Sequence, residues 1–531
     1  MLLTFIGADH EVTGSCHVLQ ACGKNMLIDC GMEQGADEFE NAEIPIPIPD
    51  IDYVFLTHAH IDHSGLLPLL YARGFRGDVF ATEATTDLCE IMLRDSAHIQ
   101  MTEAEWKNRK GQRAGRELVE PLYNMEDAEG VIDCFVAMEY ERVYDISEGL
   151  RVRFSDAGHL LGSASIEIWL EENGVSRKVV FSGDIGNINR PIINDPHYIE
   201  ETDYVVMEST YGDRYHNDNV DYVRELAQIC QRTFDRGGNV VIPAFAVGRT
   251  QEMLYYFRKI KADNMVKGHN FHVYVDSPLA VEATRIFNRN IAGCFDEEAM
   301  QLVEQGINPL QFQGLTLSIT SNDSKAINFD NKPKVILSAS GMCEAGRIRH
   351  HLKHNLWRPE CTVVFVGYQA GGTFGRILLD GATEVKLFGE AIDVKAEVVK
   401  LDGVSGHADK NGLIKWVQSF KNRPRQVFVV HGEDQVATSF AQCLNDEYGI
   451  RAEAPYTGAV YDLIEGRFVK EGSRVHKEKK APARKVSDVF ERLLAAGRRL
   501  LTVIKHNEGG ANKDLAKFAD QINSMCDKWD R

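Results

Sequence analysis

Short apolar runs separated by polar turns dominate the first 208 residues of the chain. Each run has the length of a β-strand and ends in a small or polar residue, as strands do before a turn. Strands are expected at 2–8, 25–31, 52–58, 77–83, 151–159, 164–170, 178–184 and 203–210. Residues 63–74 and 85–115 instead carry apolar side chains at helical spacing. Alternating strands and helices indicate sheets covered by helices, which is an α/β fold class.

A second pattern, of longer alternating helices and strands, begins near residue 211. Helical spacing over 220–238 precedes an apolar strand, and a further helix is expected to begin near Arg249. The apolar runs of this part have few polar positions, as buried parallel strands do. The first pattern returns near residue 395. We therefore expect a discontinuous core, 1–208 with 396–468, and an inserted α/β domain at 209–395.

Composition does not alter the expected fold, but it bears on the compartment and on the substrate that we expect. The formal net charge is -19, and the eleven cysteines form no Cys-x-x-Cys pair. Scattered thiols suit a reducing cytoplasm, where we expect the protein to act. No apolar run approaches the ~20 residues of a membrane helix, so no membrane partner is expected. An acidic surface repels phosphate, so a nucleic-acid substrate would have to be bound locally, and the charge alone favours a small substrate.

The strongest chemical signal is the segment His58-Ala-His60-Ile-Asp62-His63, which follows an expected strand directly. Imidazole nitrogens and carboxylate oxygens are ligands that zinc accepts. A loop at a strand end can turn alternate side chains in opposite directions, so this segment can serve two neighbouring metals. We predict a metal site here.

Further ligands are needed, because four residues cannot complete two metal sites. Three other strand ends supply candidates: His159, Asp184 and His431. A carboxylate can bridge two zinc ions, since each of its oxygens can bind one of them. Asp184 is our candidate for that bridge.

These segments together resemble the β-CASP nucleases of the metallo-β-lactamase superfamily. Asp29 in LIDCG, the cluster from His58 to His63, His159 and Asp184 match the core motifs in order. Three more positions match the additional motifs of the branch: Glu208 in MEST, His407 in SGHAD and His431 in VHGE. The resemblance runs to about residue 468 and includes GADHEVTGSC, IPAFAVGRTQE, SASGMCEAGR and GYQAGGTFGR. It extends to the endonuclease subunit of the cleavage and polyadenylation specificity factor and, more distantly, to ribonuclease J.

The resemblance implies an αββα sandwich with an inserted β-CASP domain. It also implies a ligand set: His58, His60 and His159 for one zinc, Asp62, His63 and His431 for the other, Asp184 as bridge, and Asp29 as support from behind. It gives His407 the role of general acid, oriented by Glu208. Two zinc ions can produce hydroxide at neutral pH and stabilise charge on a phosphate, with Asp62 and Asp184 in the catalytic centre. Manganese is the alternative metal.

The implied activity is hydrolysis of RNA phosphodiester bonds, leaving a 5′-phosphate and a 3′-hydroxyl. Internal cutting and trimming from the 5′ end both stay open. Other hypotheses are a zinc hydrolase of a small thioester, lactone or β-lactam, a DNA nuclease of the same family, and a non-catalytic paralogue. The insertion argues against a small substrate, and the complete set of ligands argues against a paralogue without activity. A homodimer is a further expectation.

The inserted domain carries candidate phosphate-binding residues. Ser338, Ser340 and Gly341 lie in a small-residue turn after a strand, and a helix is expected to start near Cys343. Backbone amides at such a helix start can bind an anion. In separate segments, Arg249 and Arg376 could bind neighbouring phosphates.

Residues 469–531 lie outside the resemblance and form a basic extension. From Lys470 to Lys505 there are eleven Lys or Arg and four Asp or Glu residues. Residues 488–504 have helical periodicity with a basic face. Two interpretations stay open, a helix that braces the body and a tail that contacts RNA or a partner.

Overall fold

A computed structural model describes residues 1–34, 41–112, 118–216, 220–401 and 405–474, and within the tail 497, 500–501, 503–505, 507–509 and 512–529. The chain divides into two compact units. The larger unit is Met1–Ser96 with Met125–Lys477, and the smaller one is Ala97–Asn124 with Glu478–Arg531. The smaller unit holds the end of α3 (Glu83–Gln112) and all of α15 (Asn512–Trp529). The helix expected at 488–504 lies largely outside the described residues.

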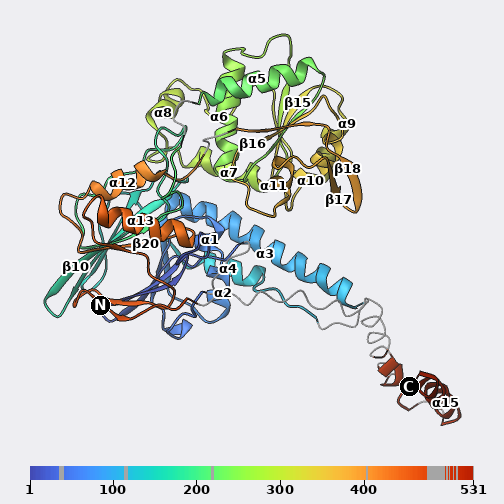
Figure 1. Cartoon of the computed structure of the whole chain (residues 1–531), viewed down its shortest axis with the longest axis horizontal. Helices are drawn as coiled ribbons and strands as arrows, with labels where there is room; N and C mark the ends of the chain where they lie inside the picture. The colour runs from blue at the N-terminus through green and yellow to red at the C-terminus, as the bar shows by residue number, and fades with distance from the viewer. Residues whose placement is uncertain are drawn as a thin grey trace. The chain divides into compact units, whose positions relative to one another are not determined.

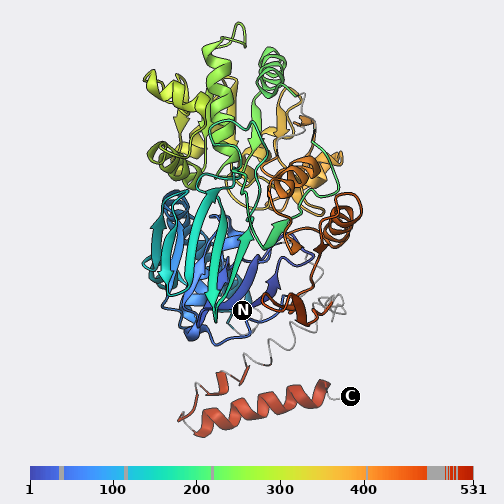
Figure 2. The same cartoon turned by 90° about the vertical axis from the view of Figure 1, so that its left-hand side faces the viewer.

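Two sheets of the larger unit face each other (Figures 1 and 2). The first has the order β23 (Arg467–Lys470), β22 (Val460–Asp462), β1 (Leu2–Gly7), β2 (Cys16–Ala21), β3 (Lys24–Ile28), β4 (Tyr53–Phe55), β5 (Asp78–Thr82), β6 (Phe135–Met138). The second has the order β21 (Ala452–Glu453), β20 (Gln426–Val430), β11 (Tyr204–Glu208), β10 (Val175–Phe181), β9 (Ala164–Glu172), β8 (Leu150–Asp156), β7 (Tyr144–Ser147). Both sheets therefore combine segments that precede and follow residues 209–395.

Alternation of apolar and polar residues builds the core between these sheets. In β8, Leu150, Val152 and Phe154 are buried while Arg151 is exposed, as expected for a strand with one face in a core. These side chains pack in one cluster with Phe5 of the first sheet. The cluster also contains Ile166, Ile168, Val179, Phe181, Val206 and Phe428 of the second sheet.

Helices cover the outer faces of the sandwich, which makes it an αββα fold. Trp416 of α12 (Lys410–Gln418) and Phe440 of α13 (Asp434–Asp446) pack against the second sheet. Figure 1 shows α12 and α13 on this side and α2 with α4 beside the first sheet. The helices of the first side are α1 (Ile61–Ser64), α2 (Leu67–Ala72), the start of α3, and α4 (Met125–Ile132); a short 3₁₀ helix, η1, spans Ile48–Asp50.

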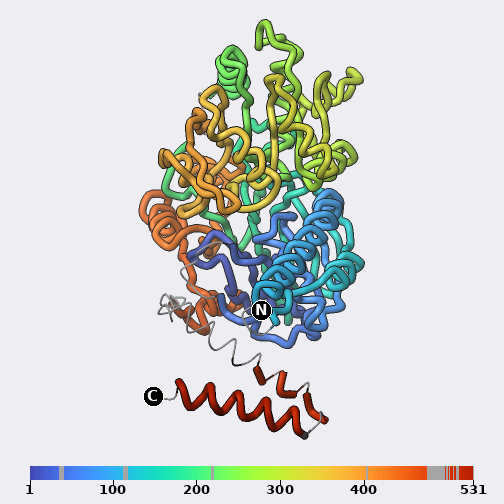
Figure 3. Tube along the Cα trace, turned by 90° about the vertical axis from the view of Figure 1, so that its right-hand side faces the viewer, coloured from blue at the N-terminus to red at the C-terminus, as the bar shows by residue number. Residues whose placement is uncertain are grey.

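A third sheet lies in the segment that separates β11 from α12, drawn in green to orange in Figure 3. Its order is β14 (Leu315–Leu317), β13 (His272–Val275), β15 (Lys334–Ser338), β12 (Val240–Pro243), β16 (Thr362–Phe365), β19 (Glu397–Lys400), and every neighbouring pair is parallel. The accompanying elements are α5 (Tyr222–Asp235), α6 (Arg249–Ala262), α7 (Pro278–Arg289), α8 (Glu297–Glu304), α9 (Ser321–Phe329), α10 (Ile348–Asn355), α11 (Phe374–Leu379) and the hairpin β17 (Glu384–Leu387), β18 (Glu390–Asp393). An inserted α/β domain is thus present, and α6 begins at Arg249 as predicted.

One boundary assignment of the sequence analysis needs correction. Residues 397–400, which we placed in the discontinuous core, form β19 and pair with β16 at the edge of the third sheet. An edge strand has a neighbouring strand on one side only. Its short apolar run therefore resembles strands of the core sandwich as much as strands of the inserted domain. Among the described residues, no helix combines the length and the apolar character needed to cross a bilayer.

The fold analysis predicts a difference between two isoleucines. Ile168 is fully buried between the facing sheets, whereas Ile307 is 41% exposed. Replacing Ile168 by Ala should cost about 2–5 kcal/mol of unfolding free energy, because it removes buried methyl groups and leaves a cavity. Ile307→Ala should cost less than about 1 kcal/mol. Urea unfolding followed by circular dichroism measures both, and equal costs would contradict the assigned core.

Candidate metal centre

Four loops, each at the end of a strand, bring the candidate ligands together. His58 and His60 follow β4, and His63 lies in the short helix α1. His159 lies between β8 and β9, Asp184 follows β10, and His431 follows β20 directly. The ends of these strands meet at one edge of the sandwich, so residues from distant parts of the sequence become neighbours.

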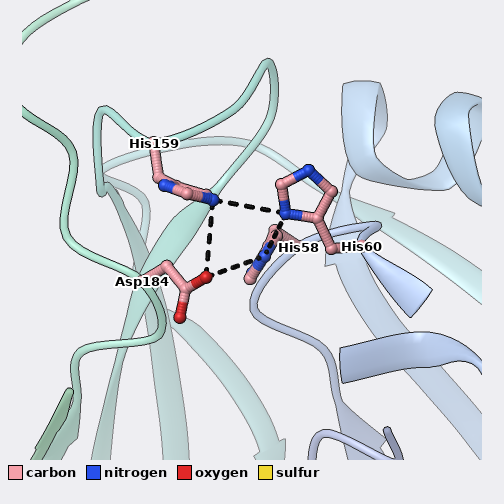
Figure 4. Close-up of side chains that lie close together, drawn as sticks. All are labelled: His58, His60, His159 and Asp184. Atoms are coloured by element: carbon pink, nitrogen blue, oxygen red, sulfur yellow. Dashed lines mark hydrogen bonds and ion pairs between the residues drawn. The ribbon is translucent and has the colours of Figure 1, made fainter. Parts of the chain in front are cut away.

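A first group is formed by His58, His60, His159 and Asp184 (Figure 4). Nδ1 of His60 lies 3.1 Å from Nε2 of His58 and 3.2 Å from Nε2 of His159. Oδ2 of Asp184 lies 3.4 Å from Nε2 of both His58 and His159. Three ring nitrogens and one carboxylate oxygen therefore point at a common centre.

A second group is formed by Asp62, His63 and His431. Nε2 of His63 lies 3.2 Å from Nε2 of His431, and Nε2 of His431 lies 3.8 Å from Oδ2 of Asp62. The other oxygen of Asp184, Oδ1, lies 3.3 Å from Nε2 of His63 and 3.7 Å from Nε2 of His431. Asp184 thus faces one group with each of its oxygens.

Partners on the far side of the rings fix which nitrogen faces each centre. Nδ1 of His63 lies 2.7 Å from Oδ2 of Asp29, and Nδ1 of His431 lies 3.1 Å from the hydroxyl of Thr210. Nδ1 of His159 lies 3.2 Å from the carbonyl oxygen of Gly406. Such partners orient metal-binding imidazoles in general.

Asp29 is itself held in place by the loop that carries the ligands. Its Oδ1 accepts a hydrogen bond from the backbone N–H of Thr57 at 2.8 Å. Its Oδ2 accepts one from the hydroxyl of Ser15 at 3.3 Å. With φ of 60°, Asp29 is in the left-handed region, which is uncommon for residues other than glycine.

The contacts between ring nitrogens fit a bound cation. When Nδ1 of His63 and of His431 each carry the proton, their Nε2 lone pairs face one another, and this contact is repulsive without a positive charge between them. Oδ1 of Asp184 is buried and has no hydrogen-bond partner among the described residues. A buried carboxylate oxygen normally has a partner, and a metal ion would supply it.

Protonation agrees with this assignment for the first group. Burial lowers the pKa of His60 to about 3, with a further contribution from His58, and burial also lowers the pKa of His58 and of His159. These rings are neutral at pH 7, which is the state in which imidazole binds a metal. Burial raises the pKa of Asp184, but His431 and His63 outweigh that effect and hold it well below its usual range.

His407 lies beside the two groups and pairs with Glu208. Its Nδ1 is 3.2 Å from both carboxylate oxygens of Glu208 and 3.9 Å from Oδ2 of Asp184. Burial lowers the pKa of His407, but Glu208 and then Asp184 outweigh it and raise the pKa to about 9. Nε2 has no partner among the described residues, so a protonated His407 has an N–H to donate.

Glu208 is fixed more rigidly than His407. It is buried, and its Oε1 accepts a hydrogen bond of 2.5 Å from the backbone N–H of Ile185, next to Asp184. Its own N–H donates to the hydroxyl of Ser182. A rigid buried carboxylate can hold one orientation of the His407 ring.

Arg190 is a residue that the sequence analysis missed. Its Nη1 donates to the carbonyl oxygens of His159 at 2.5 Å and of Gly406 at 3.2 Å. Its Nε and Nη2 donate to Oε1 of Glu252, on α6, at 2.8 and 2.5 Å. One side chain thus ties a ligand loop and the loop before His407 to the inserted domain. Only its position six residues after Asp184 could have drawn attention to it.

Several of the candidate phosphate-binding side chains have partners within the protein. Arg249 pairs with Glu252, and Arg376 pairs with Asp380 at 2.8 Å. The hydroxyl of Ser338 is buried and donates to the backbone oxygen of Asp276 at 2.8 Å. These contacts engage each side chain inside the inserted domain.

The turn after Ser338 also corrects one prediction. The helix expected near Cys343 begins five residues later, at Ile348, and Arg347 precedes it without a side-chain cap. Cys343 and Gly346, in the turns before the helix, have positive φ values of 64° and 80°, which a right-handed helix does not accept. Ser340 is partly exposed, and its hydroxyl lies 3.3 Å from the backbone oxygen of Ala345.

Comparison with protein families matches three parts of the chain. The metallo-beta-lactamase superfamily matches residues 11–75. The Beta-Casp domain matches residues 250–378. The Zn-dependent metallo-hydrolase RNA specificity domain matches residues 391–455, a range that contains His407 and His431.

Curated relatives are similar over most of the chain. Ribonuclease TTHA0252 of Thermus thermophilus is 38% identical over 448 residues, which cover 84% of this chain and 96% of the relative. The transcription termination factor FttA of Methanosarcina mazei is 30% identical, over 85% of this chain and 70% of its own length. The RNase J-like protein of Methanocaldococcus jannaschii is 30% identical, over 87% of this chain and 100% of its own length. The chain therefore belongs to the metallo-β-lactamase superfamily and, within it, to the β-CASP branch.

Proposed function

We propose that the chain is a metal-dependent ribonuclease that hydrolyses phosphodiester bonds. The observation that carries the proposal is the position of Asp184, whose two oxygens face two groups of ligands while His407 lies 3.9 Å from one of them. The names of the relatives, a ribonuclease and an RNase J-like protein, favour RNA over DNA and over a small thioester or lactone.

The ligand set supports two metal ions. His58, His60 and His159 would hold one, Asp62, His63 and His431 would hold the other, and Asp184 would bind both. Five imidazoles favour zinc over manganese, because manganese prefers oxygen ligands. When bound, a pair of such ions acidifies water and stabilises negative charge on a phosphate. Asp29 would keep His63 in the tautomer that binds.

The chain's own residues would protonate the leaving oxygen. The phosphate lies between the ligand groups and the inserted domain, with its 3′-oxygen toward His407. His407 donates the proton of Nε2 to that oxygen, and the carboxylate of Glu208 stabilises the imidazolium before the transfer and fixes the ring. A water oxygen adds to phosphorus as the bond from phosphorus to the 3′-oxygen breaks. One product then ends in a 3′-hydroxyl and the other in a 5′-phosphate.

Binding of the substrate backbone falls to the inserted domain. Ser340 and Gly341 offer a small-residue turn, and Arg249 and Arg190 both pair with the carboxylate of Glu252. Arg376 is a further candidate on the exposed surface. Action in the cytoplasm and a homodimer stay predictions.

Metal content tests the ligand assignment. Protein purified without chelator and supplied with zinc should contain about two zinc ions per chain, as a two-metal site requires. His431→Ala should contain about one, because the first group keeps all its ligands. The matched control is His197→Ala, at a histidine whose side chain is 47% exposed. Elemental analysis gives these numbers, and wild-type protein that holds one ion or none would refute the pair of sites.

The role of His407 is tested by separating metal binding from catalysis. His407→Ala should keep both metals and lower kcat on RNA by ~10²- to 10⁴-fold, the usual contribution of a general acid. Most of that loss should disappear with RNA whose 3′-bridging oxygen is replaced by sulfur, because a thiolate leaves without being protonated.

Two results would contradict this role for His407. Loss of a metal from His407→Ala would make His407 a ligand. A loss of rate that is equally large with the sulfur-bridged substrate would show that His407 does not protonate the leaving group. Glu208→Gln should show the same dependence on the leaving group as His407→Ala, since it acts through that ring.

A further inference from the structure

Two exposed aromatic side chains stand in loops at one edge of the third sheet. The exposed fractions of Phe245 and Tyr368 are 45% and 51%. The residues around them are mostly buried: Ala244, Ala246 and Val247 beside Phe245, and Gln369 after Tyr368. Rigid surroundings and an exposed ring are what a stacking surface requires, because little entropy is lost when a ligand binds it.

Strand order places the two rings next to the turn that holds Gly341. The parallel strands β12, β15 and β16 are neighbours, so the loops that follow them emerge at the same edge. A Cβ atom on Gly341 would lie 3.1 Å from Cδ2 of Phe245, so the ring packs on the bare backbone of this glycine. The side-chain amide of Gln369 donates to the carbonyl oxygen of Gly341 at 3.0 Å. Both aromatic loops are therefore fixed to one turn.

The same edge faces the catalytic residues. A Cβ atom on Gly248, in the loop of Phe245, would lie 3.0 Å from Leu160, the residue after His159. Tyr211 packs edge-on against the ring of His407, with 6.0 Å between ring centroids.

Charge makes an aromatic contact especially useful in this protein. With a net charge of -19, the chain gains little from long-range attraction to phosphates. Stacking of a base on an aromatic ring does not depend on charge and tolerates any base, since every base has a π-face. A protein of this charge can hold RNA through such contacts.

We propose that Phe245 and Tyr368 form a stacking platform for unpaired bases of the RNA next to the bond that is cut, with the backbone passing over Ser340 and Gly341. This inference rests on the proposed ribonuclease function. It adds to that function the residues that hold the bases, and it gives both exposed rings a common ligand.

A double-mutant cycle between protein and RNA tests the platform. A fluorescent single-stranded oligonucleotide is compared with versions that carry one abasic nucleotide at successive positions around the cut bond. Binding is measured by anisotropy in the His407→Ala protein, which slows cleavage, and cleavage is measured in the protein with His407 intact. Phe245→Leu and Tyr368→Leu keep an apolar side chain but remove the π-face.

At one position for each ring, the abasic nucleotide and the Leu substitution should each weaken binding roughly 5- to 150-fold, the range for one stacked base. The abasic nucleotide and the Leu substitution combined should weaken binding no further than either change alone. Phe329→Leu is the matched control. Phe329 is 78% exposed, but it precedes β15 and lies at the opposite edge of the sheet.

Two results would overturn the platform. In the first, the abasic nucleotide and the Leu substitution multiply their effects on binding at every position of the RNA. In the second, both Leu variants bind the RNA unchanged, which would point to a protein partner for these rings. Failure of the proposed function looks different. In that case the protein with His407 intact does not cut the unmodified oligonucleotide, whatever the cycle shows.

Discussion

The structure depends on one electrostatic requirement, that imidazole lone pairs crowded around a buried carboxylate need positive charge between them. The Nε2 atoms of His63 and His431 are 3.2 Å apart, and Asp184 is buried between the two ligand groups. Few arrangements of a chain tolerate this without bound cations. The sandwich supplies the rigid frame, because every ligand loop starts from a strand held on both sides. The loops can then hold the candidate ligands in place.

A second consequence concerns the inserted domain. Glu208 ends the last core strand before the insertion, and His407 lies just after it, yet their side chains are 3.2 Å apart. The pair forms only when both ends of the insertion lie together. Arg190 strengthens the same junction, since it joins the carbonyl of His159 to Glu252 of α6. The position of the inserted domain and the geometry of the proposed general acid are therefore coupled.

Much of this arrangement could be predicted from the sequence, for physical reasons. Strands such as 164–170 and 178–184 were predictable because their apolar runs and terminal turns are local signals, and the cluster from His58 to His63 is dense enough to indicate a metal by itself. Arg190 was not predictable, because its importance comes from three contacts that are distant in sequence. The helix after Ser340 was placed too early, since two residues with positive φ delay its start. The assignment of residues 397–400 to the core was wrong, because a short edge strand has a similar apolar pattern in the core sandwich and in the inserted domain.

The central claim is that the chain cuts RNA by adding water to phosphorus with departure of the 3′-oxygen. It is tested most directly by cleavage of a defined RNA in water enriched in ¹⁸O, under single-turnover conditions, with mass spectrometry of both products. The account predicts one ¹⁸O atom in a new 5′-phosphate and an unlabelled 3′-hydroxyl. A 2′,3′-cyclic phosphate, a label in a 3′-phosphate, or intact RNA in the presence of zinc-loaded protein would contradict it.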